Sequence, residues 1–433
     1  MEPRLTLTIT GCSHQGEGIG RTSSGQVVFV PYALPGEVVE CVVTQTKKDY
    51  ARGRLLEIHL PAAGRVEPPC KVYYTCGGCH LQHAAYPLQL EIKTRQVAEA
   101  LSRLGKIQDF LLHPIMAMEE PWRYRHKVHL HPGIIEGAAA LGLYREKSHQ
   151  LLRIPDCLLL PRDMVEVWHI LENQLPLSWL NYLQGVVLKK SQATGDQMVA
   201  FWTRRWGHPD RRLIAKLIPH RVSTVVQIKS GRESRVLAGT GYIQERLGPL
   251  VFRLSATSFF QVNPSQAMEL FQRAIAWAGL GGKETVVDVY SGTGTIALFA
   301  ARQAHKVYGI EVLDEAVEDA RINAQHNGLQ NVFFLKGKAE EVLPKLIAQE
   351  KHIHVIILDP PRQGCQEKVL DAVATCRPHR VVYVSCNPAT LARDAARLLF
   401  RGYRLAEVQP IDLFPQTHHV ECVALFLPIK EKK

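Results

Sequence analysis

From about residue 283 onward, short apolar runs alternate with helical stretches, and this regularity limits the possible folds more than any other feature of the chain. We expect strands at 285–290, 306–312, 331–335, 353–358 and 380–385. Strands that alternate with helices in this way form a mainly parallel, doubly wound sheet. Ligands of such sheets bind beyond the carboxyl ends of the strands, so the residues after each strand are the candidate site residues.

The rest of the chain predicts two further domains. Its 433 residues exceed a single hydrophobic core. Short β-rich runs broken by glycines in residues 1–60 predict a small OB-like barrel, a fold that commonly binds oligonucleotides. Prolines then mark the start of an α+β central domain at 61–250, with a helix over 86–104 that we expect to pack on the C-terminal domain. Residues 251–433 form the α/β domain.

The charge balance and the cysteines restrict the class of partner. Lysine and arginine outnumber aspartate and glutamate by 52 to 41, a formal net charge of +11. A polyanion suits such a chain, because released counterions drive binding to nucleic-acid phosphates. The chain lacks a membrane-length apolar run and a secretory signal, so we expect a cytoplasmic protein without a membrane partner. The ten cysteines then indicate metal binding or catalysis rather than disulfides.

The turn after the first strand of the C-terminal domain has the composition of an adenosine-binding site. The run 286–290 leads into Gly292-x-Gly294-x-x-Ala297, where the glycines let a ligand approach the backbone. The second strand ends at Glu311, whose carboxylate can accept hydrogen bonds from both ribose hydroxyls. By itself this pattern also fits a nicotinamide cofactor, and Glu311 could be an ordinary surface carboxylate.

Two further strand ends carry residues that a nicotinamide enzyme does not need, Asp359-Pro360-Pro361-Arg362 and Ser385-Cys386-Asn387-Pro388. Paired prolines fix φ and remove amide donors, which shapes a rigid turn over a planar substrate. Together with three more motifs, these two motifs follow the order found in the RNA (uracil-5-)-methyltransferase family, and the chain resembles that family. Those three motifs are Ser258-Phe259-Phe260-Gln261-Val262-Asn263, Asp288-Val289-Tyr290-Ser291-Gly292-Thr293-Gly294 and His419-Val420-Glu421.

The resemblance covers essentially the whole chain and implies its fold and reaction. It implies a TRAM barrel, a central domain with an iron–sulfur segment and a Rossmann-like methyltransferase domain that uses S-adenosylmethionine. The nucleophile would be Cys386, which attacks carbon 6 of a uridine because carbon 5 is inert until a thiolate activates the ring. The general base that removes the carbon 5 proton would be Glu421. A thiolate nucleophile also predicts a depressed pKa for Cys386.

The resemblance further assigns the contacts to S-adenosylmethionine. One position departs from the family pattern, because Lys338 stands where an acid or asparagine is usual, and a lysine cannot accept from the adenine amino group. The backbone or Glu340 would then accept the hydrogen bond from the adenine amino group. The implied cofactor contacts are Gln261, Tyr290, Gly292, Thr295, Glu311 and Asp359.

An RNA uridine is stacked and must be extruded before a thiol can reach it, so stacking rings and cations should line its path. The candidate stacking rings are Phe259 and Phe260. The resemblance places Arg125 near the extruded base, and the barrel offers Lys47 and Lys48. Each of these side chains could equally be an ordinary core or surface residue.

Four cysteines have the spacing of a metal site. Cys70, Cys76 and Cys79 are close together, and Cys157 follows after a long gap. Four thiolates suit either tetrahedral zinc or an iron–sulfur cluster, and the spacing leaves both open. The resemblance, which includes the Cys-Gly-Gly-Cys-His run, implies a 4Fe-4S cluster. Methyl transfer involves no net electron flow, so we expect the cluster to be structural.

The resemblance is to the 23S ribosomal RNA branch of the family, which predicts a role in rRNA processing, and a monomer is the default. Transfer RNA is the alternative substrate, because related archaeal enzymes keep the cluster and act on transfer RNA. Cytosine-5 enzymes usually pair two cysteines in separate motifs, and amino methyltransferases end the proline motif in an aromatic where this chain has Arg362. A non-catalytic RNA-binding protein with the same fold is the remaining alternative.

Overall fold

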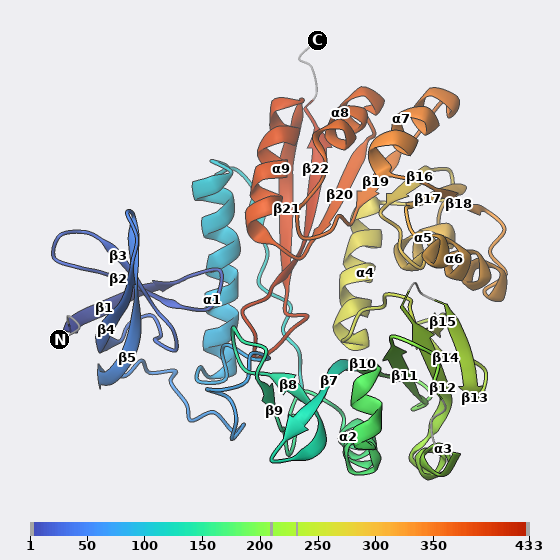
Figure 1. Ribbon diagram of the computed structural model, residues 1–433. Coiled ribbons are helices and arrows are strands. Elements are labelled where there is room, and N and C mark those ends of the chain that lie inside the picture. Colours follow the sequence, from blue (N-terminus) through green and yellow to red (C-terminus); the bar gives the residue numbers. More distant parts are fainter. Residues whose placement is uncertain (1–3, 208–210, 231–232, 430–433) are drawn as a thin grey trace.

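The computed structural model describes residues 4–207, 211–230 and 233–429. An N-terminal barrel, a central sheet domain and a C-terminal α/β domain follow one another along the chain, and helix α1 (Tyr86–Glu99) stands between the barrel and the C-terminal domain (Figure 1). None of the described helices is long and apolar enough to cross a membrane.

The N-terminal barrel is a closed sheet with the strand order β1-β2-β3-β5-β4. It closes because β1 pairs with both β2 and β4. Alternate residues of the strands point inward, and Leu7, Ile9, Val28 and Val30 form part of a buried core. The expected barrel is confirmed. Its strands are β1 (Arg4–Cys12), β2 (Gly18–Arg21), β3 (Val27–Val30), β4 (Val38–Thr46) and β5 (Tyr50–Leu60).

The C-terminal sheet has the strand order β18-β17-β16-β19-β20-β22-β21-β6. The first five of these strands are parallel and lie where the sequence predicts them, whereas β22 runs antiparallel to both β20 and β21. The strands are β16 (Thr285–Val289), β17 (Lys306–Glu311), β18 (Val332–Lys336), β19 (Val355–Leu358), β20 (Arg380–Ser385), β21 (Tyr403–Ile411), β22 (Glu421–Pro428) and β6 (Leu111–Leu112).

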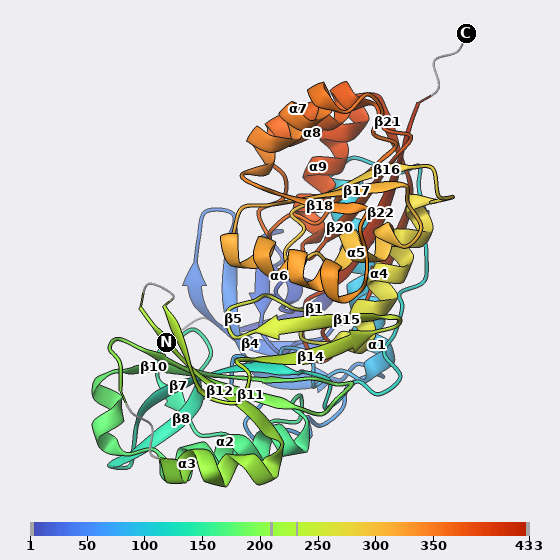
Figure 2. The ribbon, with the colours of Figure 1, turned by 90° about the vertical axis from the view of Figure 1, so that its right-hand side faces the viewer.

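Helices cover both faces of this sheet, as Figures 1 and 2 show. One face buries Val286 and Ile357 under α4, α5 and α6, and the other buries Val287 and Ile356 under α1, α7, α8 and α9. The chain reverses direction across the sheet between β16 and β19, which is where ligands of such sheets bind. The helices are α4 (Pro264–Ala278), α5 (Thr295–Ala301), α6 (Asp314–His326), α7 (Ala339–Gln349), α8 (Glu367–Cys376) and α9 (Pro388–Phe400).

The central domain is α+β, as expected. Its sheet has the order β13-β12-β11-β10-β7-β8-β9, and α2 and α3 pack against it around the fully buried Trp168. A separate hairpin of β14 and β15 leads into the C-terminal domain, where β15 contacts α6. The elements are β7 (Lys127–Ile135), β8 (Ala138–Tyr144), β9 (Leu151–Leu152), α2 (Arg162–Gln174), β10 (Leu183–Lys190), β11 (Gln197–Thr203), α3 (Arg211–Leu217), β12 (Val222–Lys229), β13 (Ser234–Ala238), β14 (Tyr242–Leu247) and β15 (Leu250–Ser255).

Residues 86–112 precede the central sheet in the chain but pack on the C-terminal domain. Helix α1 continues as a π-helical turn over Ala100–Leu104, and both contact α9. The short strand β6 pairs with β21 at the edge of the C-terminal sheet. The C-terminal sheet therefore contains a strand that lies far away in the sequence.

Candidate active site

Three reactive side chains gather where β19, β20 and β22 meet at one edge of the C-terminal sheet. Asp359 directly follows β19, and Cys386 directly follows β20. Glu421 opens β22, which runs antiparallel to β20 with Ser385 opposite Cys422. This register puts Cys386 beside Glu421, because the end of β20 and the start of β22 lie at the same edge.

Burial and the neighbouring carboxyl groups disfavour ionisation of the Cys386 thiol. Burial, followed by the charges of Glu421 and Asp359, raises the pKa of Cys386 to about 12, and Arg362 opposes the rise. Burial also raises the pKa of Asp359 to about 7 and lifts the pKa of Glu421 well above its ordinary value. The predicted depressed pKa of Cys386 is therefore wrong in this structure, because the sequence does not reveal the acids that surround the thiol.

The turn after β16 is held to the end of β17 by hydrogen bonds. Tyr290 has a φ of +70° and Gly292 a φ of +54°, a left-handed conformation that is uncommon for a tyrosine. The backbone N–H of Gly292 donates to Oε2 of Glu311 at 3.0 Å, and those of Val312 and Leu313 donate to Oε1 at 2.8 and 2.9 Å. The carboxylate is thus oriented, and of its roughly four lone pairs the one that remains can accept from a ribose.

Buried polar atoms without partners lie beside this turn. Within the part of the chain that the structure describes, the buried hydroxyl of Ser291 has no partner, and the buried carboxylate of Asp288 has only the backbone N–H of Ala297 close to it. Burial, and then the charge of Asp359, raises the pKa of Asp288 well above its ordinary value. Buried polar groups are normally hydrogen-bonded, so a ligand with donors would satisfy them. The ammonium and hydroxyl groups of S-adenosylmethionine fit this requirement, and Thr295 begins α5 nearby in the chain.

The segment before α4 exposes one aromatic ring and buries the next. Phe259 is 64% exposed, whereas Phe260 is 8% exposed and belongs to the core. The expectation that Phe260 stacks on a nucleobase is therefore wrong. Gln261 is half-buried, and the carbonyl of Val262 accepts from the backbone N–H of His126 at 2.7 Å, which ties this segment to the central domain.

The other predicted RNA contacts lie on two different domains. Burial, then the cations around it, among them Arg362 and Arg125, lowers the pKa of His419 to about 4. Arg125 therefore lies within electrostatic reach of the residues just before Glu421. Lys47 and Lys48 are exposed in the turn between β4 and β5 of the barrel, not at the sheet edge.

The four predicted metal-binding cysteines are brought together. Burial raises the pKa of Cys79, and the charges of Cys157, Cys76 and Cys70 raise it further. Backbone N–H groups hydrogen-bond two of the sulfurs, from Gly78 to Cys76 and from residues 159 and 160 to Cys157. Hydrogen bonds to cysteine sulfurs are typical of iron–sulfur sites.

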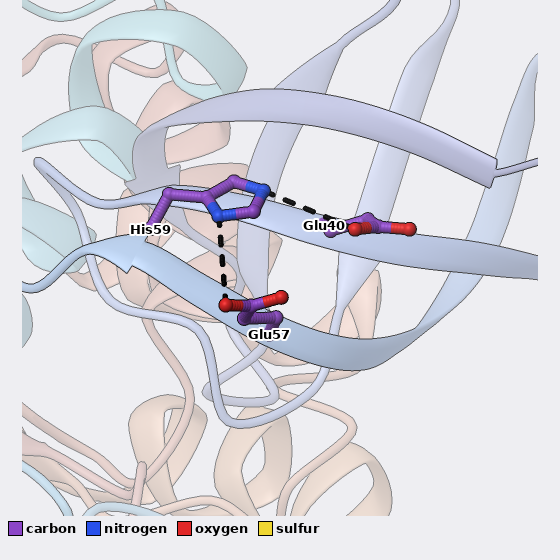
Figure 3. Close-up of side chains that lie close together, drawn as sticks. All are labelled: Glu40, Glu57 and His59. Carbon is purple, nitrogen blue, oxygen red and sulfur yellow. Dashed lines mark ion pairs between the residues drawn. The ribbon is translucent and has the colours of Figure 1, made fainter.

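A different group on the barrel has its ligand atoms closer together. Glu40, Glu57 and His59 are the one set of three metal-ligand side chains, within the described ranges, whose ligand atoms all lie within 4.8 Å of one another (Figure 3). His59 forms ion pairs of 3.9 Å with each of the two glutamates. These contacts explain the proximity of the three side chains, two of which are exposed.

A buried ion pair near the active-site edge was not predicted from the sequence. Lys93 Nζ lies 2.5 Å from Oδ1 of Asp412, and both side chains are 0% exposed. Lys93 belongs to α1 and shares its buried face with Gln89, Val97 and Leu101. In the sequence, the only sign that Lys93 is buried is that it lies four residues from Gln89 and from Val97, on the same face of the helix. A lysine at such a position usually extends to solvent.

Comparison with known proteins identifies relatives over the whole chain. A sequence profile of the tRNA (uracil-5-)-methyltransferase family matches residues 203–429, more than half of the chain, and one of the TRAM domain matches residues 4–56. An uncharacterized RNA methyltransferase of Halalkalibacterium halodurans is 41% identical over 97% of this chain and 96% of its own. One of Caldanaerobacter subterraneus is 41% identical over 98% of this chain and 97% of its own.

A solved structure has the same architecture. The crystal structure of Pyrococcus abyssi tRNA (uracil-54, C5)-methyltransferase in complex with S-adenosyl-L-homocysteine matches with a TM-score of 0.76 and 25% identity, over 98% of this chain and 99% of that chain. The expected family, TRAM barrel and methyltransferase fold are confirmed. The chain belongs to the tRNA (uracil-5-)-methyltransferase family and uses S-adenosylmethionine to methylate carbon 5 of uracil in RNA.

Proposed function

We propose that Cys386 is the nucleophile and Glu421 the general base of this uracil methylation. The observation that carries the proposal is the meeting of Cys386, Glu421 and Asp359 at one sheet edge. Cys386 is half-buried, whereas Glu421 is only 5% exposed. A partly accessible thiol beside a buried carboxyl group suits a nucleobase that enters from outside after it has been extruded from RNA.

In the proposed reaction, the sulfur of Cys386 forms a bond to the uracil ring and later releases it. The thiolate of Cys386 adds to carbon 6 of uracil, which moves an electron pair toward carbon 5 and O4. Carbon 5 then takes the methyl group of S-adenosylmethionine, and the sulfur–methyl bond of the donor breaks to leave S-adenosylhomocysteine. Glu421 removes the proton from carbon 5, the carbon 5–carbon 6 double bond forms again, and sulfur leaves carbon 6. The uridine has then exchanged its carbon 5 proton for a methyl group, and the cysteine is free.

The raised pKa of Cys386 restricts when the thiolate can form. With a pKa of about 12, roughly one thiol in 10⁵ is ionised at pH 7. Arg362 is the cation of this chain that opposes the effect, because it lowers the pKa of both Cys386 and Glu421. S-adenosylmethionine supplies the methyl group and a second positive charge, which favours the ionised forms of the acids around it.

The turn after β16 is the proposed binding site for S-adenosylmethionine. Glu311 would accept from the ribose, and Asp288 would pair with the cationic end of the ligand, because its buried carboxylate has only the backbone N–H of Ala297 to stabilise it. The proposed contacts are Gln261, Tyr290, Gly292, Thr295, Glu311 and Asp359.

The proposed RNA surface extends from the active site toward the barrel. Phe259 offers an exposed ring for stacking, and Arg125 offers a charge near His419. Lys47 and Lys48 would contact phosphates farther away on the barrel, in a manner that depends on charge and not on sequence.

We assign a 4Fe-4S cluster to Cys70, Cys76, Cys79 and Cys157. No three of these sulfurs lie within 4.8 Å of one another, whereas a zinc tetrahedron with bonds of about 2.3 Å would place them about 3.8 Å apart. The wider spacing supports the larger cluster, and the backbone N–H groups directed at Cys76 and Cys157 would stabilise the thiolates that either centre needs. Such a cluster would tie the segment around residues 70–79 to the central domain.

We propose a uridine of 23S ribosomal RNA as the substrate, and a monomer in the cytoplasm as the working form. The support is the resemblance of the barrel and the cysteine segment to the ribosomal branch of the family. Transfer RNA is the second candidate, because the solved structure that matches over 98% of the chain is a transfer RNA enzyme.

The covalent step can be trapped with RNA that contains 5-fluorouridine. Fluorine cannot leave carbon 5 as a proton does, so the wild-type enzyme with S-adenosylmethionine should form a complex that survives denaturation. Cys386→Ala should form none, whereas Cys376→Ala, which removes a half-buried thiol at the end of α8, should behave as wild type. Trapping by Cys386→Ala would contradict the assignment of the nucleophile.

Alkylation of Cys386 should be slow at neutral pH and accelerate with pH. A thiol with a pKa of about 12 gains about tenfold in thiolate for each pH unit, so the rate should climb without a plateau from pH 7 to pH 9. Mass spectrometry of the Cys386 peptide after iodoacetamide treatment measures the rate, with a small-molecule thiol as reference. A plateau below pH 8 would mean that the thiol is already ionised.

Metal analysis can distinguish an iron–sulfur cluster from zinc at the four cysteines. Protein purified without oxygen should contain about four iron atoms and four sulfides per chain and little zinc, as the cluster formula requires. Cys157→Ser should lose the iron, and Cys376→Ser should keep it. Stoichiometric zinc without sulfide would contradict the cluster.

Modification mapping can identify the RNA. A strain without the gene should lack one 5-methyluridine in 23S ribosomal RNA and regain it when the wild-type gene is restored, but not with Cys386→Ala, because the proposed nucleophile is absent. Loss of the modification from transfer RNA alone would replace the ribosomal assignment by the second candidate.

A further inference from the structure

The loop 412–420 joins β21 to β22 and leads directly into Glu421. Connecting loops normally run over the surface, where water satisfies their backbone. Here Asp412 and Leu413 are 0% exposed, and Gln416 and Thr417 are nearly as buried. A buried loop must find protein partners for its backbone groups, so its conformation depends on whatever supplies them.

Four successive carbonyl groups of this loop accept hydrogen bonds from four different parts of the chain. The carbonyl of Leu413 accepts from the side chain of Asn263 at 3.0 Å, and that of Phe414 from Nζ of Lys93 at 3.0 Å. Pro415 accepts from the hydroxyl of Tyr124 at 2.8 Å. The carbonyl of Gln416 accepts from the backbone N–H groups of residues 80 and 81, at 2.9 and 3.0 Å. The loop is thus held by the segment before α4, by α1, by the start of the central domain and by the cysteine segment.

The side chains of the loop strengthen this attachment. Asp412 pairs with the fully buried Lys93, and its backbone N–H donates to the carbonyl of Met116 at 3.0 Å. The amide of Gln89 both donates to Oε1 of Gln416 at 2.9 Å and accepts from its backbone N–H at 3.0 Å. Gln416 has a φ of +69°, a conformation that a non-glycine residue keeps only when its surroundings hold it there.

We propose that Lys93, Gln89 and Tyr124 are positioning residues that hold the loop 412–420, and through it Glu421, at the distance and angle that proton abstraction requires. The proposal rests on the proposed role of Glu421. The same contacts assign a function to the cysteine segment: residues 80 and 81, which follow Cys79, hold the loop by their backbone, so this segment supports the general base without electron transfer.

The proposal separates two steps of the reaction. Addition of the Cys386 thiolate and uptake of the methyl group precede proton abstraction and do not need Glu421. A displaced general base should therefore leave these steps intact and slow the release of sulfur from carbon 6. The methylated nucleotide would then stay bonded to the protein, an effect that general destabilisation of the fold does not produce.

Tyr124→Phe tests this with the loss of a single hydroxyl. Its matched control is Tyr403→Phe, because Tyr403 is also buried and donates to a backbone carbonyl, that of Val373 at 3.5 Å, but does not contact the loop. The substrates are S-adenosylmethionine with a labelled methyl group and total ribosomal and transfer RNA from a strain without the gene. Turnover is measured together with the label that remains on the denatured protein after RNase digestion.

For Tyr124→Phe we expect kcat to fall about tenfold, part of the roughly 10²–10⁴-fold that a general base contributes. The KM for S-adenosylmethionine should stay within about twofold, because the ligand turn is untouched. Label should accumulate on the protein with ordinary RNA, and trapping by 5-fluorouridine RNA should proceed at the wild-type rate. Tyr403→Phe should match the wild type in every measurement.

A second variant guards against simple misfolding. Replacing the buried ion pair by apolar residues in Lys93→Met/Asp412→Leu leaves no unpaired charge, and such replacements often preserve stability. It should also accumulate labelled protein. Wild-type behaviour of both variants, or a slower turnover without label on the protein, would overturn the proposal. Failure of the wild type itself to methylate or to be trapped would instead refute the proposed function of Cys386 and Glu421.

Discussion

The antiparallel placement of β22 beside β20 is the constraint on which the active site depends. In a wholly parallel sheet, only residues that follow strands meet at the ligand-binding edge. Because β22 runs in the opposite direction, its first residue, Glu421, reaches the edge that receives Cys386 from β20. Neighbouring strands thus bring the proposed nucleophile and the proposed general base together, while Asp359 follows the next strand along.

Burial of several acids at this edge determines their protonation. Asp288, Asp359 and Glu421 each have a raised pKa because burial disfavours the charged form, and Glu421 and Asp359, together with burial of the thiol, raise the pKa of Cys386. Perturbed groups of this kind cluster at functional sites. In the proposed mechanism, the cationic methyl donor and Arg362 offset this crowding of acids, so the nucleophile ionises only when the substrates are in place.

The domains meet at the loop that precedes Glu421. Its carbonyls accept from α1, the segment before α4, the start of the central domain and the cysteine segment, so the position of the proposed general base depends on much of the chain. Lys93 illustrates why sequence could not show this. A lysine on an amphipathic helix normally extends to solvent, and only the approach of Asp412 from another element makes its burial possible.

The sequence alone predicted the five parallel strands, the barrel and the strand-end positions of Cys386 and Glu311, because strand–helix alternation is local and these two residues adjoin their strands. It did not predict β22, the antiparallel strand that brings Glu421 to the same edge. Only the tertiary structure decided that Phe259 is exposed and Phe260 buried, that burial and nearby acids raise the pKa of Cys386, and that Lys93 donates to the loop before Glu421. Burial and electrostatic surroundings are set by residues from distant segments, and their approach leaves no pattern in the local sequence.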